Sequence, residues 1–345
     1  MRHAKLTSLV LSLALGAALA LPAAAAGEAP PVSGEGGSAP SEPAYQVSRP
    51  QESLPIPVWG TVSALREDRL LLTCDSEDAP YSQIVVRVTE STPVLDAVSG
   101  EARSLAALQE GEVVYAWVGP AMTRSLPPIA NAALLLCGIP GDFHTPAYAE
   151  VENVFRSGDQ LSVYMSNHIV LHLDADTKLL AAPGQEAPSL EDIVPGARLL
   201  SWYTFAALSN PPQSSPSQVV VFPSQYDGYV SVPGLGMDVH LNGAPLELPE
   251  KAPAKVEDGH LMLPVRAVAE ALGCQVGWDN DANAAVVSRD GTELYRLVPG
   301  QDTAVWKGSG AALLTAPQVT DGVTYLSLED LVLLHGLKLE SPCFL

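Results

Sequence analysis

The central part of the chain repeats itself at one constant offset of 85 residues, and this repetition limits the folds available to it. The apolar run at 84–88 matches the run at 169–173, and Trp117 matches Trp202. Further matched positions are Thr92 with Thr177, Leu95 with Leu180, Ser104 with Ser189, Leu105 with Leu190, Gly111 with Gly196, and 134–136 with 219–221. One offset held over this distance predicts two homologous units, at residues 51–140 and 146–223.

Each unit is rich in short strand patterns. The segment 69–73, for example, is an apolar run bounded by turn residues, which is typical of a β-strand. The segments 105–111 and 190–196 indicate a single helical turn closed by glycine. About five strands and one short helix per unit predict a mainly β protein of small barrels or sandwiches with OB-like character. The Pro-rich stretches 126–128 and 210–216 occupy matching places and are predicted to be exposed loops.

After a Gly- and Pro-containing linker at about 224–236, the pattern changes to an α+β domain at residues 237–345. Asn242-Gly243 is a strong two-residue hairpin signal. A strand pattern runs into Pro264, which suits the first turn of a helix because an N–H group is not needed there. Apolar residues at helical spacing continue to Gly273, which is expected to end the helix. Strand patterns follow at 275–278, 284–289 and 292–298.

This third segment also repeats internally, at an offset of 63 residues. Asp258-Gly259 matches Asp321-Gly322, and Leu263 matches Leu326. The second half departs from the first at three positions, where Pro264 becomes Ser327, Arg266 becomes Glu329 and Glu270 becomes Leu333. Any role of the arginine and the glutamate is therefore predicted only for the first half.

The residues at 258–279 form the most specific motif of the chain. They place Pro264, Arg266, Glu270, Gly273, Trp278 and Asp279 at fixed spacing across a turn, a strand, a helix and a second strand. This pattern resembles the copper amine oxidase N-terminal domain, a stalk module of bacterial extracellular proteins, and the resemblance covers about 237–339. It implies a module outside the cell that is not an enzyme.

Copper amine oxidase chemistry itself requires a tyrosine-derived quinone and three histidines around copper. The sequence contains neither an Asn-Tyr-Asp/Glu cofactor motif nor a His-x-His pair. The resemblance therefore implies only the non-catalytic stalk, and no cofactor is expected.

The motif residues are predicted to act structurally. Arg266 and Glu270 lie four apart on one helix face, where opposite charges meet. We interpret them as a pair that orients the helix on the sheet, with a binding role as the alternative. Trp278 is expected to pack on that helix.

The N-terminal 26 residues have the features of a secretory signal peptide. Arg2 and Lys5 precede an apolar run, and Ala24 and Ala26 suit a small-x-small cleavage site. An uncleaved membrane anchor is the alternative, although the run is short for a bilayer span. The Pro-, Gly- and Ser-rich segment 27–50 is predicted to be a disordered spacer. No integral membrane segment is expected after cleavage.

The chain is strongly acidic, with a formal net charge of −21 at pH 7. Loss of the signal peptide would remove Arg2 and Lys5 but no acid, which leaves −23. Such a charge excludes nucleic acid as a partner, because phosphate contacts need clustered Lys and Arg. It also disfavours anionic membrane surfaces.

Four cysteines permit several arrangements. If disulfides form, we expect pairing within domains, Cys74 with Cys137 and Cys274 with Cys343. Buried free thiols are an equally good interpretation.

Other candidate sites are weaker. Asp279, Asp281 and Asn283 have the spacing of a calcium loop, but the glycine and glutamate expected later in an EF-hand are missing, which favours a tight turn. His168 and His172 lie in a strand-like segment, where residues four apart are too distant to share a metal. Trp117 and Trp202 are candidate ligand-facing aromatics for a carbohydrate, with a place in the core as the favoured interpretation.

These observations predict a non-catalytic secreted or cell-envelope binding and scaffold protein, whose partner is cell-wall polymer or another surface protein. The alternative is an extracellular hydrolase of wall polymer or glycan with an unrecognised carboxylate site. A calcium-stabilised surface protein is a third hypothesis.

Overall fold

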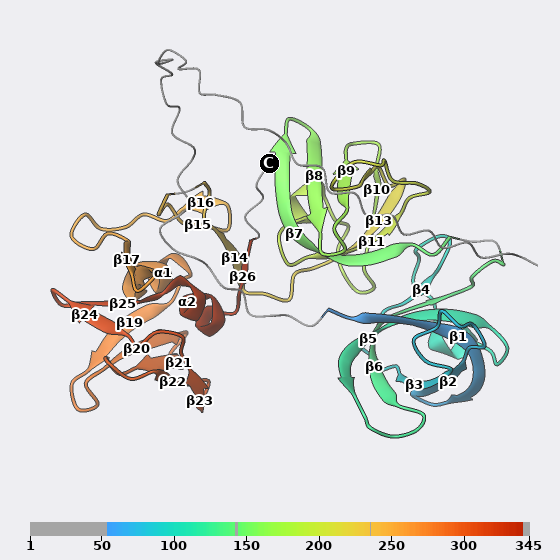
Figure 1. Cartoon of the computed structure of the whole chain (residues 1–345), viewed down its shortest axis with the longest axis horizontal. Coiled ribbons are helices and arrows are strands. Elements are labelled where there is room, and N and C mark those ends of the chain that lie inside the picture. The colour runs from blue at the N-terminus through green and yellow to red at the C-terminus, as the bar shows by residue number, and fades with distance from the viewer. Residues whose placement is uncertain (1–53, 142–143, 235, 341–345) are drawn as a thin grey trace, which may run out of the picture. The chain divides into compact units, whose positions relative to one another are not determined.

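The computed structural model describes residues 54–141, 144–234 and 236–340 (Figure 1). The predicted signal peptide at 1–26, the spacer at 27–50 and Cys343 lie outside these residues. The described part is mainly β, as predicted, and its two α-helices both belong to the third segment. No described helix is long and apolar enough to cross a membrane.

The first repeat forms a closed five-stranded barrel. Its strands follow the order β3-β2-β1-β5-β6, and a parallel pairing between β3 and β6 closes the ring. The short strand β4 adds to β6, and a 3₁₀ turn, η1 (Leu105–Ala107), precedes β5. This is the strand order of an OB-like barrel, which confirms the predicted fold class. The bounds are β1 (Ile56–Arg66), β2 (Arg69–Thr73), β3 (Gln83–Arg87), β4 (Val94–Asp96), β5 (Val113–Met122) and β6 (Ile129–Cys137).

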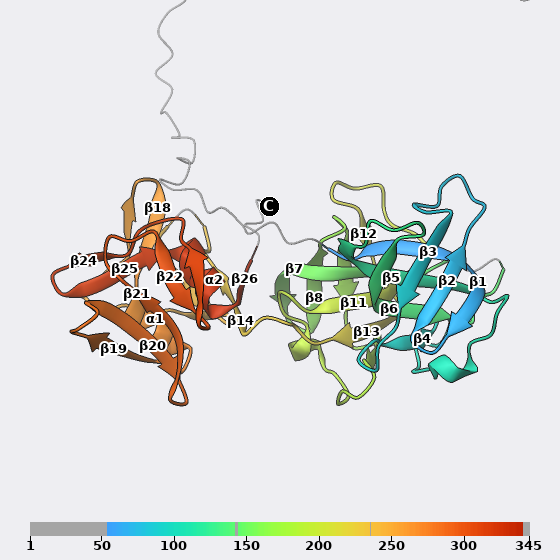
Figure 2. The same cartoon turned by 90° about the horizontal axis from the view of Figure 1, so that it is seen from below.

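The second repeat has the same topology, with its last strand divided in two (Figure 2). β12 pairs in parallel with β9, while β13 pairs with β10 and β11. Together β12 and β13 therefore take the place of β6. The bounds are β7 (Ala147–Ser157), β8 (Gln160–Met165), β9 (Val170–Leu173), β10 (Lys178–Ala181), η2 (Leu190–Asp192), β11 (Arg198–Trp202), β12 (Gln213–Ser214) and β13 (Gln218–Phe222).

Strand pairing corrects the alignment of the two repeats at their C-terminal ends. Leu136 lies opposite Tyr115 in the first barrel, and Val220 lies opposite Leu200 in the second. Tyr115 and Leu200 are 85 apart, but Leu136 and Val220 are 84 apart, because the second repeat has one residue fewer before its last strand. The runs of Leu and Val at 134–136 and 219–221 hid this shift, since neighbouring residues in them are nearly alike.

The two barrels share a buried apolar cluster in addition to their own cores. Trp117 and Trp202 both lie in this cluster and are 6% and 8% exposed. The indole N–H of Trp202 donates a hydrogen bond of 2.8 Å to the carbonyl oxygen of Ala97 in the first repeat. The hypothesis of an exposed carbohydrate platform at these two tryptophans does not agree with this burial, because their ring faces are covered by the other repeat. The remaining buried members are Leu95, Ala97, Leu134, Leu136, Ala182, Leu200, Val220 and Phe222.

The third segment is built from two similar halves that pair through their equivalent strands β18 and β25. Leu263 on β18 lies directly opposite Leu326 on β25, and these two leucines are equivalent in the 63-residue repeat. A local two-fold relation therefore passes between them and relates helix α1 (Val265–Ala271) to α2 (Leu328–His335). The other bounds are β14 (Gly228–Ser231), β15 (His240–Leu241), β16 (Ala244–Pro245), β17 (Lys255–Glu257), β18 (His260–Pro264), β19 (Gln275–Asp279), β20 (Ala284–Arg289), β21 (Thr292–Leu297), β22 (Thr303–Trp306), β23 (Ser309–Ala312), β24 (Gln318–Thr320), β25 (Val323–Ser327) and β26 (Leu337–Leu339).

The helix ends explain why the two halves tolerate different residues. Pro264 precedes α1 without a side-chain cap, whereas the Ser327 hydroxyl caps α2 by accepting a hydrogen bond from the N–H of Asp330. Gly336 adopts a left-handed conformation with φ of 65° at the end of α2, which favours glycine. Gly273 has φ of 74° just beyond α1. In each half, the residues next to the helix determine where the helix begins and ends.

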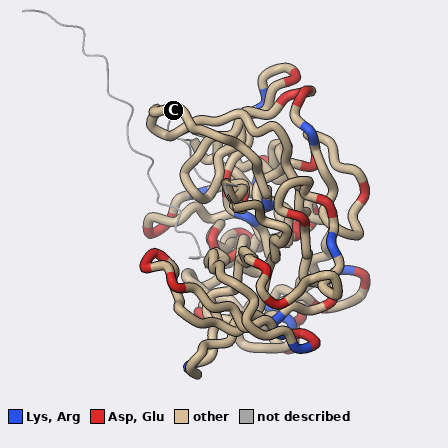
Figure 3. The backbone as a smooth tube through the Cα atoms, turned by 90° about the vertical axis from the view of Figure 1, so that its right-hand side faces the viewer, with Lys and Arg blue, Asp and Glu red and all other residues tan. Residues whose placement is uncertain are grey.

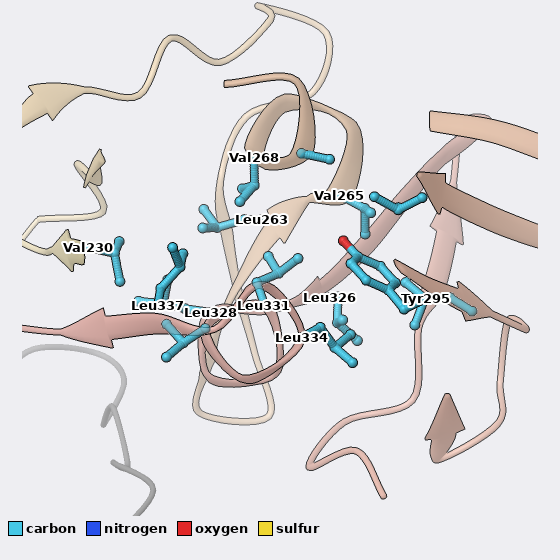
Figure 4. Close-up of a cluster of buried hydrophobic side chains, with 14 of the residues drawn as sticks. Val230, Leu263, Val265, Val268, Tyr295, Leu326, Leu328, Leu331, Leu334 and Leu337 are labelled. Atoms are coloured by element: carbon cyan, nitrogen blue, oxygen red, sulfur yellow. The ribbon is translucent and has the colours of Figure 1, made fainter. Parts of the chain in front are cut away.

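The core of the third segment packs both helices against the strands (Figure 4). Leu331 of α2 is fully buried there, beside Leu263 and Leu326. Strand β14 contributes Val230 to the same core and pairs with β15 and β26. Part of the segment 224–236, which the sequence analysis assigned to a linker, therefore belongs to this sheet.

We predict that Leu331→Ala lowers the free energy of unfolding by about 2–5 kcal/mol, because it removes buried methyl groups and leaves a cavity. Leu333 lies on the same helix and is 36% exposed, so Leu333→Ala is a matched control expected to cost less than about 1 kcal/mol. Urea unfolding monitored by circular dichroism measures both. Equal losses in the two variants would contradict this packing.

A buried histidine makes the stability of this segment depend on pH. The ring of His335 lies 2.7 Å from the Tyr295 hydroxyl through Nε2. Burial, together with the nearby Arg289 charge, lowers the pKa of His335 to about 4. At pH below about 6.5 the unfolded chain binds a proton that the folded chain does not bind, so stability falls as the pH falls.

We predict that this histidine removes up to about 3 kcal/mol of stability between pH 7 and pH 4. His335→Gln keeps a hydrogen-bonding group but cannot titrate, so its unfolding free energy should lack this part of the pH dependence. Urea titrations at several pH values test the difference. Parallel pH profiles for the wild type and the variant would contradict the assignment.

Candidate functional site

A pocket of about 420 Å³ opens where the second barrel meets the beginning of the third segment. Its lining combines aromatic rings with charged and amide side chains, as small-ligand pockets commonly do. The lining residues are Arg156, Glu191, Val194, Pro195, Ser224, Tyr226, Asp227, Gly228, Tyr229 and Asn242.

The barrel side of the pocket is held by a local ion pair. Arg156 at the end of β7 places Nη1 3.2 Å from Oε1 of Glu191 and donates from Nη2 to the Leu190 carbonyl oxygen at 3.1 Å. Glu191 belongs to η2, whose first turn is fixed by a capping box between Ser189 and Asp192. The guanidinium is therefore oriented by the same turn that the sequence predicts at 190–196.

The opposite side comes from the segment that follows the barrel. The backbone N–H of Tyr229 donates to the side-chain oxygen of Asn242 at 2.9 Å, and the N–H of Asp227 donates to the Gly336 carbonyl oxygen at 2.9 Å. Burial raises the pKa of Tyr229 above its ordinary value. The phenol is protonated at neutral pH in either case and is able to donate a hydrogen bond.

The absence of a side chain at Gly196 leaves space for the ring of Tyr226. A Cβ atom at this position would lie 2.5 Å from the ring of Tyr226, and the backbone has φ of 88°. Both the close approach and the left-handed backbone require glycine. The sequence pattern predicts only the end of a helical turn at Gly196 and gives no sign of its contact with Tyr226.

Buried charges lie next to the pocket. Nζ of Lys338 is 2.7 Å from Oε1 of Glu150 and 3.6 Å from Oε1 of Glu152. The second carboxylate oxygen of Glu150 lies 3.3 Å from Nε of Arg198. Glu150 is 1% exposed, so these partners offset its desolvation. Lys338 also lies 5.5 Å from the ring centre of Tyr226, which links the ion pairs to the pocket wall.

The polar groups of the pocket are already engaged by neighbouring residues. The Ser224 hydroxyl already accepts a hydrogen bond from the N–H of Tyr226 at 3.2 Å, and no histidine lines the pocket beside it. Glu191 is engaged by Arg156, and Asp227 lies 3.8 Å from Arg289. Within the described residues, no group of three or more His, Cys, Asp or Glu side chains is arranged to hold a metal ion.

The predicted ion pair of the motif forms away from this pocket. Nη1 of Arg266 lies 3.3 Å from Oε1 of Glu270, and both side chains are more than half exposed. The same nitrogen donates to the carbonyl oxygen of Val276 on β19 at 2.9 Å. This contact ties α1 to the neighbouring strand β19.

Trp278 and Asp279 follow on β19. Trp278 is 43% exposed, more than the predicted packing on the helix implies, because it lies on an edge strand at the end of the core-facing row. The carboxylate of Asp279 accepts hydrogen bonds from the N–H groups of Asp281 and Ala282 and from Arg296. Those from Ala282 and Arg296 are the main causes that lower the pKa of Asp279. The carboxylate caps a turn, an arrangement that favours the tight turn over a calcium loop.

The histidines and cysteines also have local roles. His168 lies in a turn with φ of 65° rather than in a strand, while His172 on β9 contacts Ser162 and Gln213. Cys74 and Cys137 are free thiols, so the disulfide expected between them is not formed. Cys137 is buried in the core of the first barrel, which agrees with the alternative of a buried thiol.

Most of the pocket was not predicted. Tyr226 and Tyr229 lie in the assigned linker, and the only signal for them was a pair of tyrosines three residues apart among Gly and Pro. Lys338 and Glu150 are 188 residues apart, and no local pattern connects them.

Comparison with known families assigns the third segment. Residues 240–339 match the copper amine oxidase N-terminal domain family, a non-catalytic module in those enzymes. This range agrees with the resemblance at 237–339 and covers the two halves related by Leu263 and Leu326. No curated protein matches the chain.

We predict that Lys338→Met lowers the free energy of unfolding by about 3 kcal/mol, because it leaves the buried Glu150 carboxylate with only one close cation. The double variant Glu150→Gln/Lys338→Met should regain most of this loss, since it removes both charges. Lys307→Met, at an exposed lysine, is the control. A single variant as stable as this control, measured by urea unfolding, would contradict the role of the pair.

Proposed function

We propose that the chain is a non-catalytic binding and scaffold protein of the cell envelope or the extracellular medium. The observation that carries this proposal is the pocket at the end of the second barrel, whose polar groups are held by ion pairs and backbone contacts. Groups fixed in this way can recognise a ligand but are not poised to exchange protons with it.

The buried contacts between the folded parts support a scaffold role. Trp202 bonds to the first repeat, and Lys338 of the third segment bonds to Glu150 of the second repeat. Contacts of this kind hold binding surfaces in a fixed relation, which favours an extended partner that touches several of them. The features at 1–50, a signal peptide followed by a polar spacer, support export and display.

Cell-wall polymer is the partner that we propose first, with another surface protein as the second. The chain is acidic, and its acidic and basic positions are interspersed along the trace (Figure 3), so a partner held by one large charged patch is disfavoured. Tyrosine rings beside amide and charged groups suit a polar polymer with apolar ring faces.

The test is co-sedimentation of the chain from residue 27 onward with purified cell wall. We expect saturable binding, weakened about fivefold or more by Tyr229→Ala because an aromatic wall of the pocket is removed. Tyr81→Ala, at a half-buried tyrosine of the first barrel, is the matched control and should bind normally. Sedimentation no greater than that of an unrelated acidic protein would contradict the proposed function.

A further inference from the structure

The outer surface of the second barrel carries a second group of aromatic and polar side chains. Leu161, Val163, Leu171 and Leu173 of β8 and β9 point into the barrel core. Because side chains alternate along a strand, Ser162, Tyr164 and His172 point outward. Phe155 of β7 lies directly opposite Ser162, which in turn lies opposite His172, so the three form one row across the strands.

Two aromatic rings stand together on this surface. Phe155 and Tyr164 have ring centres 5.8 Å apart in an edge-to-face arrangement. Phe155 is 37% exposed, and Tyr164 is half-buried. The pair therefore presents apolar ring surface to solvent, at positions where the barrel core gains nothing from it.

Polar side chains continue the row toward the other edge. The ring nitrogens of His172 lie 3.1 Å from the Ser162 hydroxyl and 2.8 Å from the side-chain oxygen of Gln213 on β12. Both ring nitrogens of His172 are therefore engaged, while the side-chain N–H groups of Gln213 and the Ser162 hydroxyl can still form hydrogen bonds toward solvent.

An aromatic loop borders the surface at β12. The N–H of Ala207 donates to the Gln213 carbonyl oxygen at 2.7 Å, and the Ser214 hydroxyl donates to the Phe205 carbonyl oxygen at 2.7 Å. Phe205 is attached to β12 in this way and is 80% exposed. The loop that carries Phe205 therefore borders β12, and its aromatic side chain is exposed to solvent.

The first barrel provides an internal comparison, because it has the same topology. The row equivalent to Phe155, Ser162 and His172 consists of Arg66, Arg69 and Arg87. Leu71, opposite Val85, occupies the position of Tyr164, opposite Val170. The fold therefore accepts arginine and leucine at these positions and does not require the aromatic set.

The composition of this surface indicates the chemical class of ligand that it suits. The outward positions 155, 162, 164, 172 and 213 carry no Asp, Glu, Lys or Arg, although 17% of the chain is charged. A surface of aromatic rings, amide, imidazole and hydroxyl groups suits a neutral ligand with apolar ring faces and hydroxyl edges. Pyranose sugars have this combination, because their C–H faces stack on aromatic rings while their hydroxyls bond to polar side chains.

We propose that this face of the second barrel is a glycan-binding site, where Phe155 and Tyr164 stack against sugar rings and the Gln213 amide, held in place by His172, bonds to their hydroxyls. The inference rests on the proposed binding function. It adds a second binding surface, separate from the pocket that Tyr226 and Tyr229 line. A glycan chain that spans several sugar units would use the aromatic pair and the loop at Phe205 together.

Isothermal titration calorimetry of the chain from residue 27 onward tests this site, with chitotetraose, cellotetraose and maltotetraose as separate probes. We expect the wild type to bind at least one of them, and Phe155→Ala and Tyr164→Ala to weaken that binding about tenfold. Arg66→Ala and Leu71→Ala change the equivalent positions of the first barrel and should leave the Kd unchanged. Thermal melting of every variant verifies that it is folded.

The results of calorimetry and sedimentation together distinguish the glycan site from the proposed function of the whole chain. Equal affinity in the wild type and both aromatic variants would overturn the site. A wild type that sediments with cell wall but binds none of the three sugars would also overturn it, while the proposed function would stand. Binding of a wall peptide in place of the sugars would show a peptide surface and overturn the glycan assignment. Failure of both sedimentation and calorimetry would remove the proposed function itself.

Discussion

The buried contact between the two barrels is the constraint on which the N-terminal half of the structure depends. Successive residues of β6 and β13 face alternately inward and outward, so Leu135 fills the first barrel's own core while Leu134 and Leu136 enter the shared cluster. Both sides of these strands are therefore apolar, which explains their continuous runs of Leu and Val. The hydrogen bond from Trp202 to Ala97 satisfies the one polar group that the indole brings into the cluster.

Burial of one outer surface in each barrel leaves the surface across β1–β3 or β7–β9 available for other roles. The two copies have diverged there, to arginines at Arg66, Arg69 and Arg87 in one and to an aromatic and polar row in the other. Positions in the shared cluster have kept their character, since Trp117 and Trp202 are alike. The difference follows from packing, because a substitution in the cluster affects both barrels, whereas one on an exposed sheet face affects only its own surface.

The sequence predicted those features that local patterns carry. The repeat at 85 residues, the OB-like strand count, and the helix between Pro264 and Gly273 all depend on short segments, and the structure contains them. The last strand was misaligned by one residue because Leu and Val runs look alike in any register. The pocket was missed because Lys338 and Glu150 meet only after folding, and because β14 within the assigned linker is four residues long. The sequence pattern predicts that Trp278 packs on the helix, but Trp278 lies on an edge strand, which leaves its side chain partly exposed.

The two halves of the third segment differ in where their charged side chains lie. In the first half Arg266 faces solvent and pairs with Glu270, and the chain continues into β19. In the second half the equivalent Glu329 is 6% exposed, with a carboxylate oxygen 3.4 Å from His260, and the Asp330 carboxylate accepts hydrogen bonds from the Ser327 hydroxyl and from the N–H groups of Leu314 and Thr315. These two acids lie in the first turn of α2, and the other end of the helix leads into β26, where Lys338 pairs with Glu150. The second half thus has buried polar contacts where the first half has a surface ion pair, and the separate pair of Lys338 with Glu150 lies next to the pocket wall.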